Sequence, residues 1–577
     1  MQKPNNGKQS KRSDCCGKSQ KHSGGGKSQK HSGGGKVQRH SDSEKAQKRS
    51  DCCENSPCAV DALCGGCSNI SIPYNKQCAD KNAAMQKLFA GVKGNFELLP
   101  IIGMKDPFHY RNKIVSPFAP GKKKKASPSQ GKRHTLDREV LTGMYAQGSH
   151  KLVPSNDCLI ENEIGKRIVA AIVKIMSKYA IPPYNEDTGS GFLRHVVVRV
   201  GHASEEVLVT LVTNQDEFPH SKSFCKELIK AVPQITTVVQ NVNTRQTNVI
   251  LGEKEHTLYG PGFILDTLCG LSFRISSQSF YQVNVTQTEV LYNTAIALAG
   301  LSGTQTVIDA YCGTGTIGLV AASRGAARVI GVESNQRAVQ DARENARHNG
   351  IKNATFVAAD ATQFMRDSAR EGAGNFGNLL GEGEGAGAAS AADPAASAAA
   401  SATAHTPNSQ ELVLLMDPPR AGSTPEFLQA AAQLAPARIV YVSCNPETQV
   451  RDILLLQKYG YELQKVQPVD MFPHTAHVET VCLLVRRNSL HIDIDVDVEE
   501  MLQEKRGQAT YAQIKDYVLE QNGLKVSSLY ISQVKRKCGL DIGENYNKPK
   551  SEDSKQPQCP SEKEEVIMNA LRHFGVI

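Results

Sequence analysis

Thr306-Val-Ile-Asp-Ala-Tyr311, which runs directly into Cys-Gly-Thr-Gly-Thr-Ile-Gly318, is the stretch that decides the fold. Its first residues are mostly apolar and predict a buried strand, and a helix is expected to follow the glycines. Gly313, Gly315 and Gly318 allow a tight turn and let the backbone approach a ligand at the N-terminus of that helix. The same spacing would suit NAD. The stretch therefore predicts a nucleotide-binding α/β domain without choosing the cofactor.

Acidic residues stand at the ends of the strands predicted next along the chain. Glu333 follows the apolar run Arg328–Val332, where a carboxylate could accept hydrogen bonds from two ribose hydroxyl groups. Asp360 ends the following strand and could reach the edge of an adenine. The alternation of strands and helices over residues 276–487 predicts a Rossmann-like α/β domain, whose ligand lies at the carboxyl ends of the strands.

Asp417-Pro-Pro-Arg420 follows another apolar strand in the same domain. Two prolines after an acid at the end of a strand fix a rigid loop, which we expect to leave Asp417 and Arg420 pointing into the ligand site. Such a loop could also be a plain stop signal. Its place beside a nucleotide fold favours the site.

A cysteine and a carboxylate complete the set of strand ends. Ser443-Cys444-Asn-Pro446 follows the apolar run Arg438–Ser443, and His477-Val-Glu479 precedes a second apolar run. A thiol and a carboxylate at neighbouring strand ends could act as nucleophile and general base. A small buried cysteine is the common alternative, but a hydride-transfer domain would leave both residues without a role.

Cys58-x5-Cys64-Gly-Gly-Cys67 forms a separate candidate site. Three thiols at these spacings, around two glycines that let the backbone wrap closely, suit an iron–sulfur cluster that takes its fourth cysteine from farther along the chain. Cys78 and Cys158 are the next cysteines. Zinc is the alternative metal, since it also accepts four thiolates. The spacing differs from the Cys-x3-Cys-x2-Cys of radical enzymes, which argues against that chemistry.

Together these stretches resemble the RNA uracil-C5 methyltransferases, which use S-adenosylmethionine as the methyl donor. The resemblance covers residues 57–487. The residues that carry it are Ser279-Phe-Tyr-Gln-Val-Asn-Val-Thr-Gln-Thr288, Asp309-Ala-Tyr-Cys-Gly-Thr-Gly-Thr-Ile-Gly318, Asp417-Pro-Pro-Arg-Ala-Gly422, Ser443-Cys-Asn-Pro446 and His477-Val-Glu479.

The resemblance implies a role for each part of the site. It makes Cys444 the nucleophile and Glu479 the general base. The side chains that it implies as cofactor contacts are Gln282, Tyr311, Glu333 and Asp417. The four-cysteine set is similar to that of the 23S ribosomal RNA branch, where it holds a 4Fe–4S cluster, and the tRNA branch generally lacks it. The members of that set are Cys58, Cys64, Cys67 and Cys158.

The chemistry that the resemblance implies requires these residue types. C5 of uracil is too poor a nucleophile to take a methyl group unaided. Addition of the Cys444 thiolate to C6 would place negative charge on C5 and O4, so that C5 can attack the methyl carbon. Glu479 would then accept the proton of C5 before the thiol is eliminated. The target base must leave its stack, which costs little in a single-stranded RNA loop.

Two alternatives to methylation of 23S ribosomal RNA stay open. One is a methyltransferase that acts on the uracil of the tRNA T loop. The other is a catalytically inactive protein that binds RNA or assists its assembly. The four cysteines argue against the first alternative, and the intact pair of Cys444 and Glu479 argues against the second.

The parts of the chain before the methyltransferase domain differ in composition. Residues 1–56 are low-complexity and basic, and we expect a disordered tail. Residues 57–275 predict the cysteine segment and an α+β RNA-binding domain with a lysine-rich loop at 121–134. The runs read as antiparallel strands of that domain are His195–Val200, Glu206–Val212 and Thr247–Leu251.

Two further segments lie within or after the methyltransferase domain. Residues 369–410 are rich in Gly, Ala and Ser and predict a flexible surface insertion. Residues 488–577 predict a helical extension with one helix in 510–518 and a basic one in 529–538. That extension is interpreted either as a helix-turn-helix-like module or as a plain interaction domain.

Bulk composition limits the classes of protein. The net charge of +9 indicates an anionic partner such as RNA. No apolar run reaches the roughly 18 residues that a membrane span needs, and the N-terminus lacks the apolar core of a signal peptide. The chain is therefore expected to be cytoplasmic, and its sixteen cysteines are expected to bind metal or take part in catalysis. We expect a monomer without a membrane partner.

Overall fold

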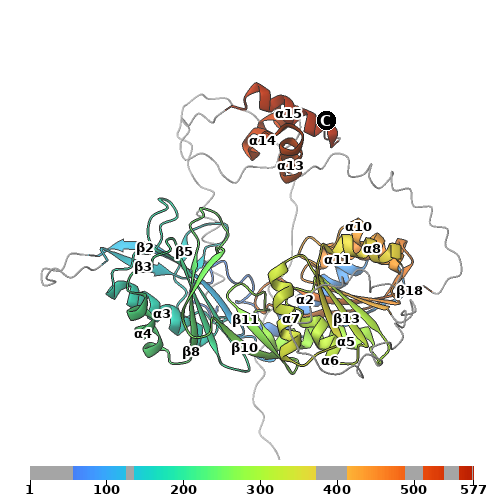
Figure 1. Cartoon of the computed structure of the whole chain (residues 1–577), viewed down its shortest axis with the longest axis horizontal. Coiled ribbons are helices and arrows are strands. Elements are labelled where there is room, and N and C mark those ends of the chain that lie inside the picture. Colours follow the sequence, from blue (N-terminus) through green and yellow to red (C-terminus); the bar gives the residue numbers. More distant parts are fainter. Residues whose placement is uncertain are drawn as a thin grey trace, which may run out of the picture. The chain divides into compact units, whose positions relative to one another are not determined.

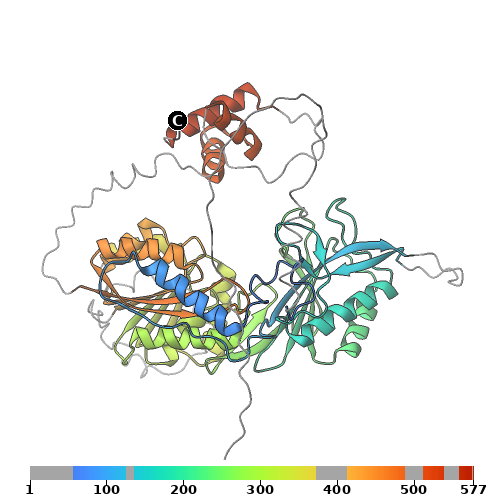
Figure 2. The same cartoon turned by 180° about the vertical axis from the view of Figure 1, so that it is seen from behind.

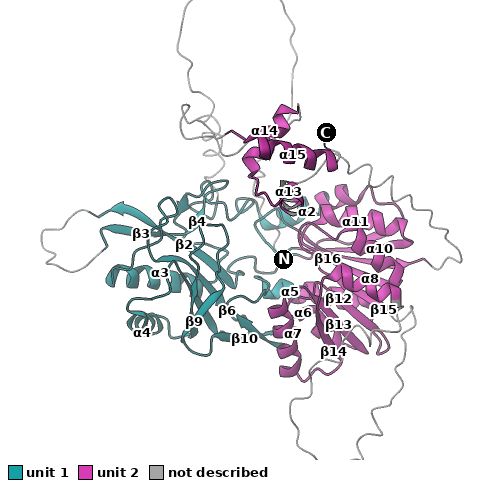
Figure 3. Ribbon diagram, turned by 45° about the horizontal axis from the view of Figure 1, so that its top comes forward, with its two compact units in different colours: residues 1–83, 103–288, 470–477 teal, residues 84–102, 289–469, 478–577 magenta. Residues whose placement is uncertain are grey.

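The structure is a computed structural model that describes residues 56–124, 136–371, 412–487, 511–538, 558–574 and 576. The chain forms two compact units (Figure 3). Unit 1 comprises residues 1–83, 103–288 and 470–477, and unit 2 comprises residues 84–102, 289–469 and 478–577. The predicted tail and insertion lie outside the described residues except at residue 56 and residues 369–371. Most of the lysine-rich loop lies outside them as well.

Unit 2 is built on one eight-stranded sheet in the order β1-β17-β18-β16-β15-β12-β13-β14. Strands β12 to β16 are parallel to their neighbours within that group, whereas β18 runs antiparallel to both β16 and β17. The strand bounds are β1 Glu97–Leu98, β12 Thr306–Ala310, β13 Arg328–Glu333, β14 Ala354–Ala358, β15 Leu412–Met416, β16 Arg438–Ser443, β17 Tyr461–Val469 and β18 Glu479–Arg486. This is the predicted Rossmann-like α/β architecture.

Helices cover both faces of this sheet (Figures 1 and 2). The group α8, α10 and α11 packs together on one face, and α6 and α7 pack against β12 to β14 on the other. Because both faces are covered, every residue of β12 and β15 is buried. The helix bounds are α5 Val285–Ala299, α6 Thr316–Ser323, α7 Gln336–His348, α8 Ala361–Glu371, α10 Pro425–Leu434 and α11 Pro446–Lys458.

The strand order of unit 2 reverses between β12 and β15. From β12 the chain proceeds to β13 and β14 on one side, and then returns to β15 and β16 on the other. At such a reversal the connections diverge and leave a crevice outside the carboxyl ends of the strands. The antiparallel β18 starts at that same edge, so its first residue joins the strand ends there.

Unit 1 is built on a six-stranded sheet in the order β3-β2-β6-β7-β8-β9. Helix α3 (Glu163–Lys178) lies on one face of it beside α4 (Ser221–Ala231), as Figure 1 shows. Apolar residues recur along α3, and Ile168, Ile172 and Met176 join one core with the valines of β6. The strand bounds are β2 Lys113–Lys123, β3 Arg138–Thr142, β6 Leu193–Val200, β7 Val207–Thr213, β8 Ile235–Val242 and β9 Lys254–Tyr259.

The predicted strands of unit 1 were correct in part. Strands β6 and β7 are present and antiparallel. The expectation of a wholly antiparallel sheet is wrong, because α4 crosses between β7 and β8 and makes them parallel. The predicted strand Thr247–Leu251 is a loop. It is held there by Asn243, whose Nδ2 donates to the carbonyl oxygens of Val249 (2.7 Å) and Ile250 (2.9 Å).

Shorter elements complete unit 1. They are the hairpin of β10 (Phe263–Leu268) with β11 (Leu271–Ser276) and the pair of β4 (Met144–Tyr145) with β5 (Leu152–Val153). Helix α2 (Tyr74–Phe89) begins in unit 1 and ends in unit 2.

The C-terminal extension forms helices at the predicted places. They are α13 (Tyr511–Asn522), α14 (Ser528–Lys537) and α15 (Ser561–His573), and apolar residues such as Ile514, Ile531 and Ile567 form one core among them. As expected from its position, the Ser527 side chain caps α14 by accepting from a backbone N–H. In the described part of the chain, no helix combines the length and the apolar character needed to cross a membrane.

A buried ion pair holds the segment Asp470–His477 in unit 1. Lys81 Nζ lies 2.7 Å from Asp470 Oδ1, and the two side chains are 4% and 0% exposed. Tyr74 Oη donates to the other carboxylate oxygen at 2.8 Å. Both partners of Asp470 lie in the first part of α2, so this carboxylate joins that helix to the connection between β17 and β18.

Asp470→Asn should destabilise the protein strongly, because it leaves the ammonium of Lys81 buried without a counter-charge. Removal of one partner of a buried pair typically costs about 3–5 kcal/mol. The measurement is the free energy of unfolding in urea. Glu97→Gln is the control, since it breaks an ion pair with Lys465 that is partly exposed and should cost less than about 1 kcal/mol. Equal losses in the two variants would contradict the prediction.

Candidate active site

Cys444 and Glu479 are brought together by the pairing of β16 with β18. The strands are antiparallel, and their register ends with Ser443 opposite Thr480. Cys444 directly follows Ser443 and Glu479 directly precedes Thr480, so both residues adjoin this last pair. Glu479 is 4% exposed, whereas Cys444 is half-buried. The predicted nucleophile and the predicted base are therefore neighbours at one edge of the sheet.

The loop that carries Asp417 and Arg420 is fastened beside Cys444. The carbonyl oxygen of Arg420 accepts hydrogen bonds from Asn445 Nδ2 (3.1 Å) and Thr448 Oγ1 (3.3 Å). Asn445 is also the N-cap of α11, where its side chain accepts from a backbone N–H. The residue after the candidate nucleophile thus fixes both the start of the helix and the loop with the two charged side chains.

Burial dominates the electrostatics of these groups. It raises the pKa of Glu479 to about 8, the charge of Asp417 adds to the rise, and Arg420 opposes it. Burial also raises the pKa of Cys444, with Glu479 and Asp417 adding and Arg420 opposing. The protein atoms packed around the Asp417 carboxyl raise its pKa to about 7, although the residue as a whole is partly exposed. A cation bound here would favour the ionised form of each of these groups.

The glycine-rich loop after β12 needs glycine for two reasons. A Cβ at Gly315 would stand 2.8 Å from the ring of Phe356, and a Cβ at Gly318 would stand 2.7 Å from Oδ2 of Asp309. Packing therefore excludes side chains at both positions. At Gly313, φ is +55°, and no heavy atom of the described chain outside its immediate neighbours lies within 4 Å of the Cβ position. That open space suits the close approach of a ligand.

Asp309, to which sequence reasoning gave no role, organises this loop. It is 1% exposed, and its Oδ2 accepts a hydrogen bond from the N–H of Gly318 at 2.9 Å. Burial raises its pKa to about 7, against the lowering effect of that hydrogen bond. The available signal was a carboxylate inside an otherwise apolar strand, which must find a partner nearby.

Glu333 and Asp360 lie at the ends of β13 and β14, as predicted. Glu333 accepts hydrogen bonds from the N–H of Gly313 (3.2 Å) and of Asn335 (2.8 Å), which ties it to the glycine-rich loop. Asp360 accepts from the N–H of Gln363 (2.9 Å) at the start of α8. Both carboxylates thus have structural partners at the ligand edge, and their contacts to ribose and adenine stay predictions.

Tyr311 and Gln282 are the remaining predicted cofactor contacts. Tyr311 has φ +66°, a left-handed backbone that costs a non-glycine residue of the order of 1–3 kcal/mol and is concentrated at functional sites. Its ring lies 5.2 Å from that of Phe427. Gln282 belongs to unit 1, and its role as a cofactor contact stays a prediction.

Asp452, in the middle of α11, is a second residue that sequence reasoning missed. It is 2% exposed and accepts hydrogen bonds from the N–H of Ser423, from Tyr441 Oη and from Arg451 Nε, all at 2.8 Å. Arg451 Nη2 also donates to the carbonyl oxygen of Ala421 at 2.9 Å. These bonds fix the end of the loop that begins with Asp-Pro-Pro-Arg. A charged pair inside an apolar helix was the available signal.

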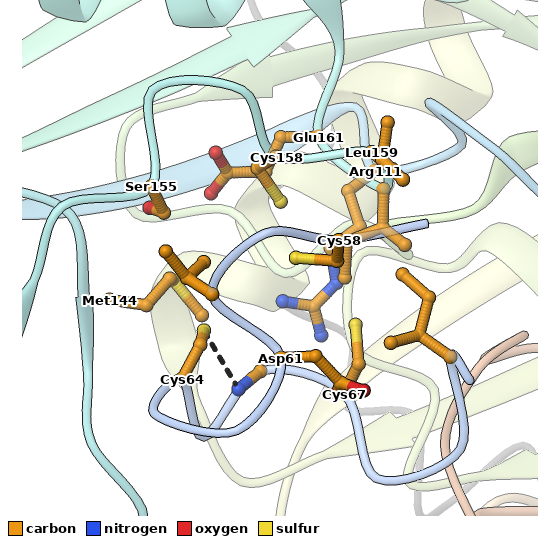
Figure 4. A pocket seen from close by; sticks show the side chains of 14 residues that line it. Cys58, Asp61, Cys64, Cys67, Arg111, Met144, Ser155, Cys158, Leu159 and Glu161 are labelled. Carbon is orange, nitrogen blue, oxygen red and sulfur yellow. Dashed lines mark hydrogen bonds between the residues drawn. The ribbon is translucent and has the colours of Figure 1, made fainter. Parts of the chain in front are cut away.

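The four predicted cluster ligands line one pocket of unit 1 (Figure 4). Cys58, Cys64 and Cys67 come from the segment before α2, and Cys158 comes from the loop before α3. Cys78 lies within α2 and does not line the pocket. Of the two candidates for the fourth position, the structure therefore brings Cys158 to the other three.

The backbone around Cys64 is wrapped closely, as its two glycines predict. The N–H of Gly66 points at Cys64 Sγ at 3.3 Å (Figure 4). The N–H of Gly65 donates to the carbonyl oxygen of Tyr145 at 3.0 Å, and a Cβ on Gly65 would stand 2.9 Å from that oxygen. Glycine is thus required at this position by the approach of a neighbouring backbone.

A single ion and a cluster make different demands on the positions of the four thiols. One zinc ion, about 2.3 Å from each sulfur, would bring the sulfurs to within about 4 Å of one another. Within the described ranges, no group of three or more Cys, His, Asp or Glu side chains is placed to hold a metal ion. In a 4Fe–4S cluster each cysteine binds a different iron, so the thiols stand farther apart. Four thiols are donors that either kind of centre could use.

The cysteine segment is hydrogen-bonded to the segment Asp470–His477. The N–H groups of Ser68 and Asn69 donate to the carbonyl oxygen of His474 at 3.1 and 3.0 Å. Gln77 Nε2 lies 3.1 Å from His474 Nδ1. The chain that leads into β18, and so to Glu479, is therefore held by the residues that follow the cysteines.

Fold and site together define a class, the S-adenosylmethionine-dependent methyltransferases. Residues 301–373 match the family model described as a methyltransferase domain, and residues 408–487 match the model of tRNA (uracil-5-)-methyltransferase. The structure is similar to that of the Pyrococcus abyssi tRNA (uracil-54, C5)-methyltransferase in complex with S-adenosyl-L-homocysteine. The TM-score is 0.53 at 24% identity, over 73% of this chain and 86% of that one.

Curated relatives identify the family. A protein of Halalkalibacterium halodurans described as an uncharacterized RNA methyltransferase is 36% identical over 75% of this chain and 84% of its own length. One of Listeria innocua with the same description is 38% identical over 74% of this chain and 83% of its own length. The chain belongs to the family of S-adenosylmethionine-dependent RNA uracil-C5 methyltransferases, and it is an RNA methyltransferase.

Glu479→Gln should flatten the pH dependence of stability. Because folding raises the pKa of Glu479 from 4.5 to about 8, the folded protein keeps a proton that the unfolded chain releases between these values. Stability therefore falls as the pH rises through this window. Glutamine cannot ionise, so the Tm of the variant should fall less between pH 6 and pH 8 than that of the wild type.

The control for this measurement is Glu462→Gln. Glu462 is half-exposed and forms an ion pair with Arg487. The substitution therefore removes a carboxyl group that is not buried. The Tm of this variant should follow the pH profile of the wild type. A profile for Glu479→Gln that is parallel to the wild type would contradict the assignment of a buried, protonated carboxyl group.

Proposed function

We propose that this protein methylates C5 of a uridine in 23S ribosomal RNA through a covalent bond between Cys444 Sγ and C6 of the uracil. The observation that carries the proposal is the pairing of β16 with β18, whose last pair, Ser443 and Thr480, adjoins Cys444 and Glu479. Arg420 and Asp417 stand beside that pair on a loop fastened to the residue after Cys444. The four cysteines of unit 1 support the choice of ribosomal RNA.

The proposed reaction uses Cys444 first. Its thiolate attacks C6, so an Sγ–C6 bond forms and the electron pair of the C5=C6 bond moves toward C5 and O4. S-adenosylmethionine, when bound, would supply the methyl group and a positive charge on sulfur: the C5–CH3 bond forms as the S–CH3 bond breaks, and the electron pair remains on the sulfur of the S-adenosylhomocysteine that leaves. The Glu479 carboxylate then takes the proton from C5, the C5=C6 bond reforms, and the Sγ–C6 bond breaks to release the thiolate.

The raised pKa values fit a site that becomes active when it binds a cation. Without one, burial favours the neutral forms of Cys444 and Glu479. A sulfonium beside these groups would lower both pKa values, because an opposite charge stabilises the ionised form. Arg420 lowers them already. We therefore propose that Cys444 and Glu479 acquire their reactive forms together with the methyl donor.

We propose further that Cys58, Cys64, Cys67 and Cys158 hold a 4Fe–4S cluster. Their common pocket supports a shared metal centre, and the spacing of Cys58, Cys64 and Cys67 suits a cluster. The hydrogen bonds from Ser68 and Asn69 to His474 support a structural role. In this proposal the cluster fixes the cysteine segment, and with it the connection that leads to Glu479.

A tRNA is the second candidate substrate. The family model that residues 408–487 match is that of tRNA (uracil-5-)-methyltransferase, and the similar Pyrococcus abyssi enzyme is a tRNA (uracil-54, C5)-methyltransferase. The same chemistry at Cys444 and Glu479 would serve that substrate. The cysteine set is the feature that favours ribosomal RNA.

A covalent trap tests mechanism and substrate together. With S-adenosylmethionine and 23S ribosomal RNA that contains 5-fluorouridine, we expect an adduct that resists denaturant, because fluorine at C5 cannot leave as a proton. Cys444→Ala should abolish the adduct. Glu479→Gln should accumulate an adduct even on ordinary uridine, since the C5 proton then lacks its acceptor. Denaturing gel electrophoresis of labelled RNA provides the readout.

The control in this experiment is tRNA substituted in the same way. An adduct on tRNA alone would keep the mechanism and replace the substrate. RNA binding without any adduct would contradict the proposed mechanism and favour a protein that only binds RNA.

Iron content tests the cluster. Protein purified without oxygen should carry about four irons per chain, and Cys67→Ser and Cys158→Ser should each lose most of it. Cys78→Ser is the matched control and should keep its iron, because Cys78 does not line the pocket. Zinc in place of iron, or equal loss in all three variants, would contradict the proposal.

A further inference from the structure

A second pocket lies in unit 2, outside the residues assigned so far. It has a volume of about 520 Å³ and is lined along α7 and at the end of β14. Helix α7 packs against β14 and β13, and Figure 1 shows it near β13. Volumes of roughly 300–1,000 Å³ are typical of ligand sites. The lining residues that matter are Gln336, Arg337, Gln340, Arg343, Arg347 and Ala358.

The polar lining comes from one side of a single helix. Gln336, Gln340, Arg343 and Arg347 follow one another at steps of four, three and four residues, which is the spacing of one helical stripe. Arg337 flanks the stripe. We call Arg337, Arg343 and Arg347 the arginine face of α7. The other side of the helix is anchored in the core by buried residues such as Ala342 and Asn345.

The arginine face carries positive charge without a counter-charge in the pocket. None of the residues that line the pocket is acidic. Arg343 is held in place by hydrogen bonds from Nε (3.2 Å) and Nη2 (2.8 Å) to the carbonyl oxygen of Phe356. All three residues are exposed. Within the described ranges, the side chains of Arg337 and Arg347 have no hydrogen-bond or ion-pair partner.

The chemistry of the face selects a phosphodiester chain. Guanidinium groups bind phosphate through two parallel hydrogen bonds, which a fixed planar fork favours. Arg337 and Arg347 are ten residues apart, or about 15 Å along a helix with a rise of 1.5 Å per residue. A single phosphate cannot reach both. A nucleic-acid strand, which advances about 3.4 Å per nucleotide along a duplex axis, spans that distance with several phosphates.

The face begins beside two of the predicted cofactor contacts. Asn335, the N-cap of α7, lies two residues after Glu333, and Ala358 at the other side of the pocket lies two residues before Asp360. A strand laid along α7 would therefore end at the edge of the sheet where the cofactor residues stand. We propose that the arginine face of α7 binds the phosphate backbone of the substrate RNA next to the nucleotide to be methylated. This inference rests on the proposed function.

The test compares two double variants of the full chain. Arg337→Gln with Arg347→Gln removes two charges from the face. Lys352→Gln with Arg366→Gln removes two exposed charges from the same unit outside the pocket. The dissociation constant for 23S ribosomal RNA transcribed in vitro is measured by filter binding from 50 to 300 mM KCl. Steady-state methylation and binding of S-adenosylmethionine are measured on the same preparations.

The face variant should bind the RNA about tenfold more weakly at 100 mM salt. The slope of log K against log salt should fall by about 1.4–1.8, because each lost phosphate contact removes about 0.7–0.9. Its KM for RNA should rise in proportion while kcat and binding of S-adenosylmethionine stay unchanged. The control variant should change less than about twofold, since exposed charges away from the RNA are screened.

Three outcomes would overturn the proposal. One is an unchanged salt slope in the face variant. Another is an equal loss of affinity in the two double variants, which would indicate a general charge effect. The third is a lower Tm of the face variant with unaltered RNA affinity, which would indicate that the arginines bind other groups of the protein and not the RNA. Failure of the proposed function is distinguishable, because the wild-type protein would then form no covalent adduct.

Discussion

The antiparallel pairing of β18 with β16 is the constraint on which the candidate active site depends. All other neighbours among β12 to β16 are parallel, so their carboxyl ends meet at one edge. Only a reversed strand can bring its first residue to that edge. The register with Ser443 opposite Thr480 then fixes which residue faces Cys444. A slip by one residue would turn the Glu479 side chain to the other face of the sheet.

Around this pair, burial and hydrogen bonding act against each other. Asp309, Asp417 and Glu479 all have raised pKa values because protein surrounds them, and Asp309 is partly compensated by the backbone of Gly318. Arg420 opposes the effect at Glu479, and its own loop is held by Asn445 and Thr448. The protein thus keeps several acids close together without accumulating their negative charge. In the proposed function, binding of the cationic methyl donor lowers the pKa values of Cys444 and Glu479 and so favours their ionised forms.

Sequence alone was sufficient where function depends on local pattern. The strand before the glycine-rich loop, the acids at strand ends, and the wrapped turn at Cys64 all follow from the order of apolar residues, glycines and prolines. Sequence reasoning failed where side-chain hydrogen bonds to the backbone decide the local structure. Thr247–Leu251 has the composition of a strand, but Asn243 takes its carbonyl groups. Asp452 and Asp309 were missed because the fold determines their hydrogen-bond partners, whereas the family resemblance had already named Cys158 as the fourth cysteine.

The division of the chain into units limits how its gene can be rearranged during evolution. The chain passes from one unit to the other after each of residues 83, 102, 288, 469 and 477. The shortest segment between two such crossings, Asp470–His477, belongs to unit 1 although both of its flanking strands belong to the sheet of unit 2. No single cut in the chain separates unit 1 from unit 2. Gene fusion or fission therefore cannot exchange one unit for another, and the two must evolve as a single piece.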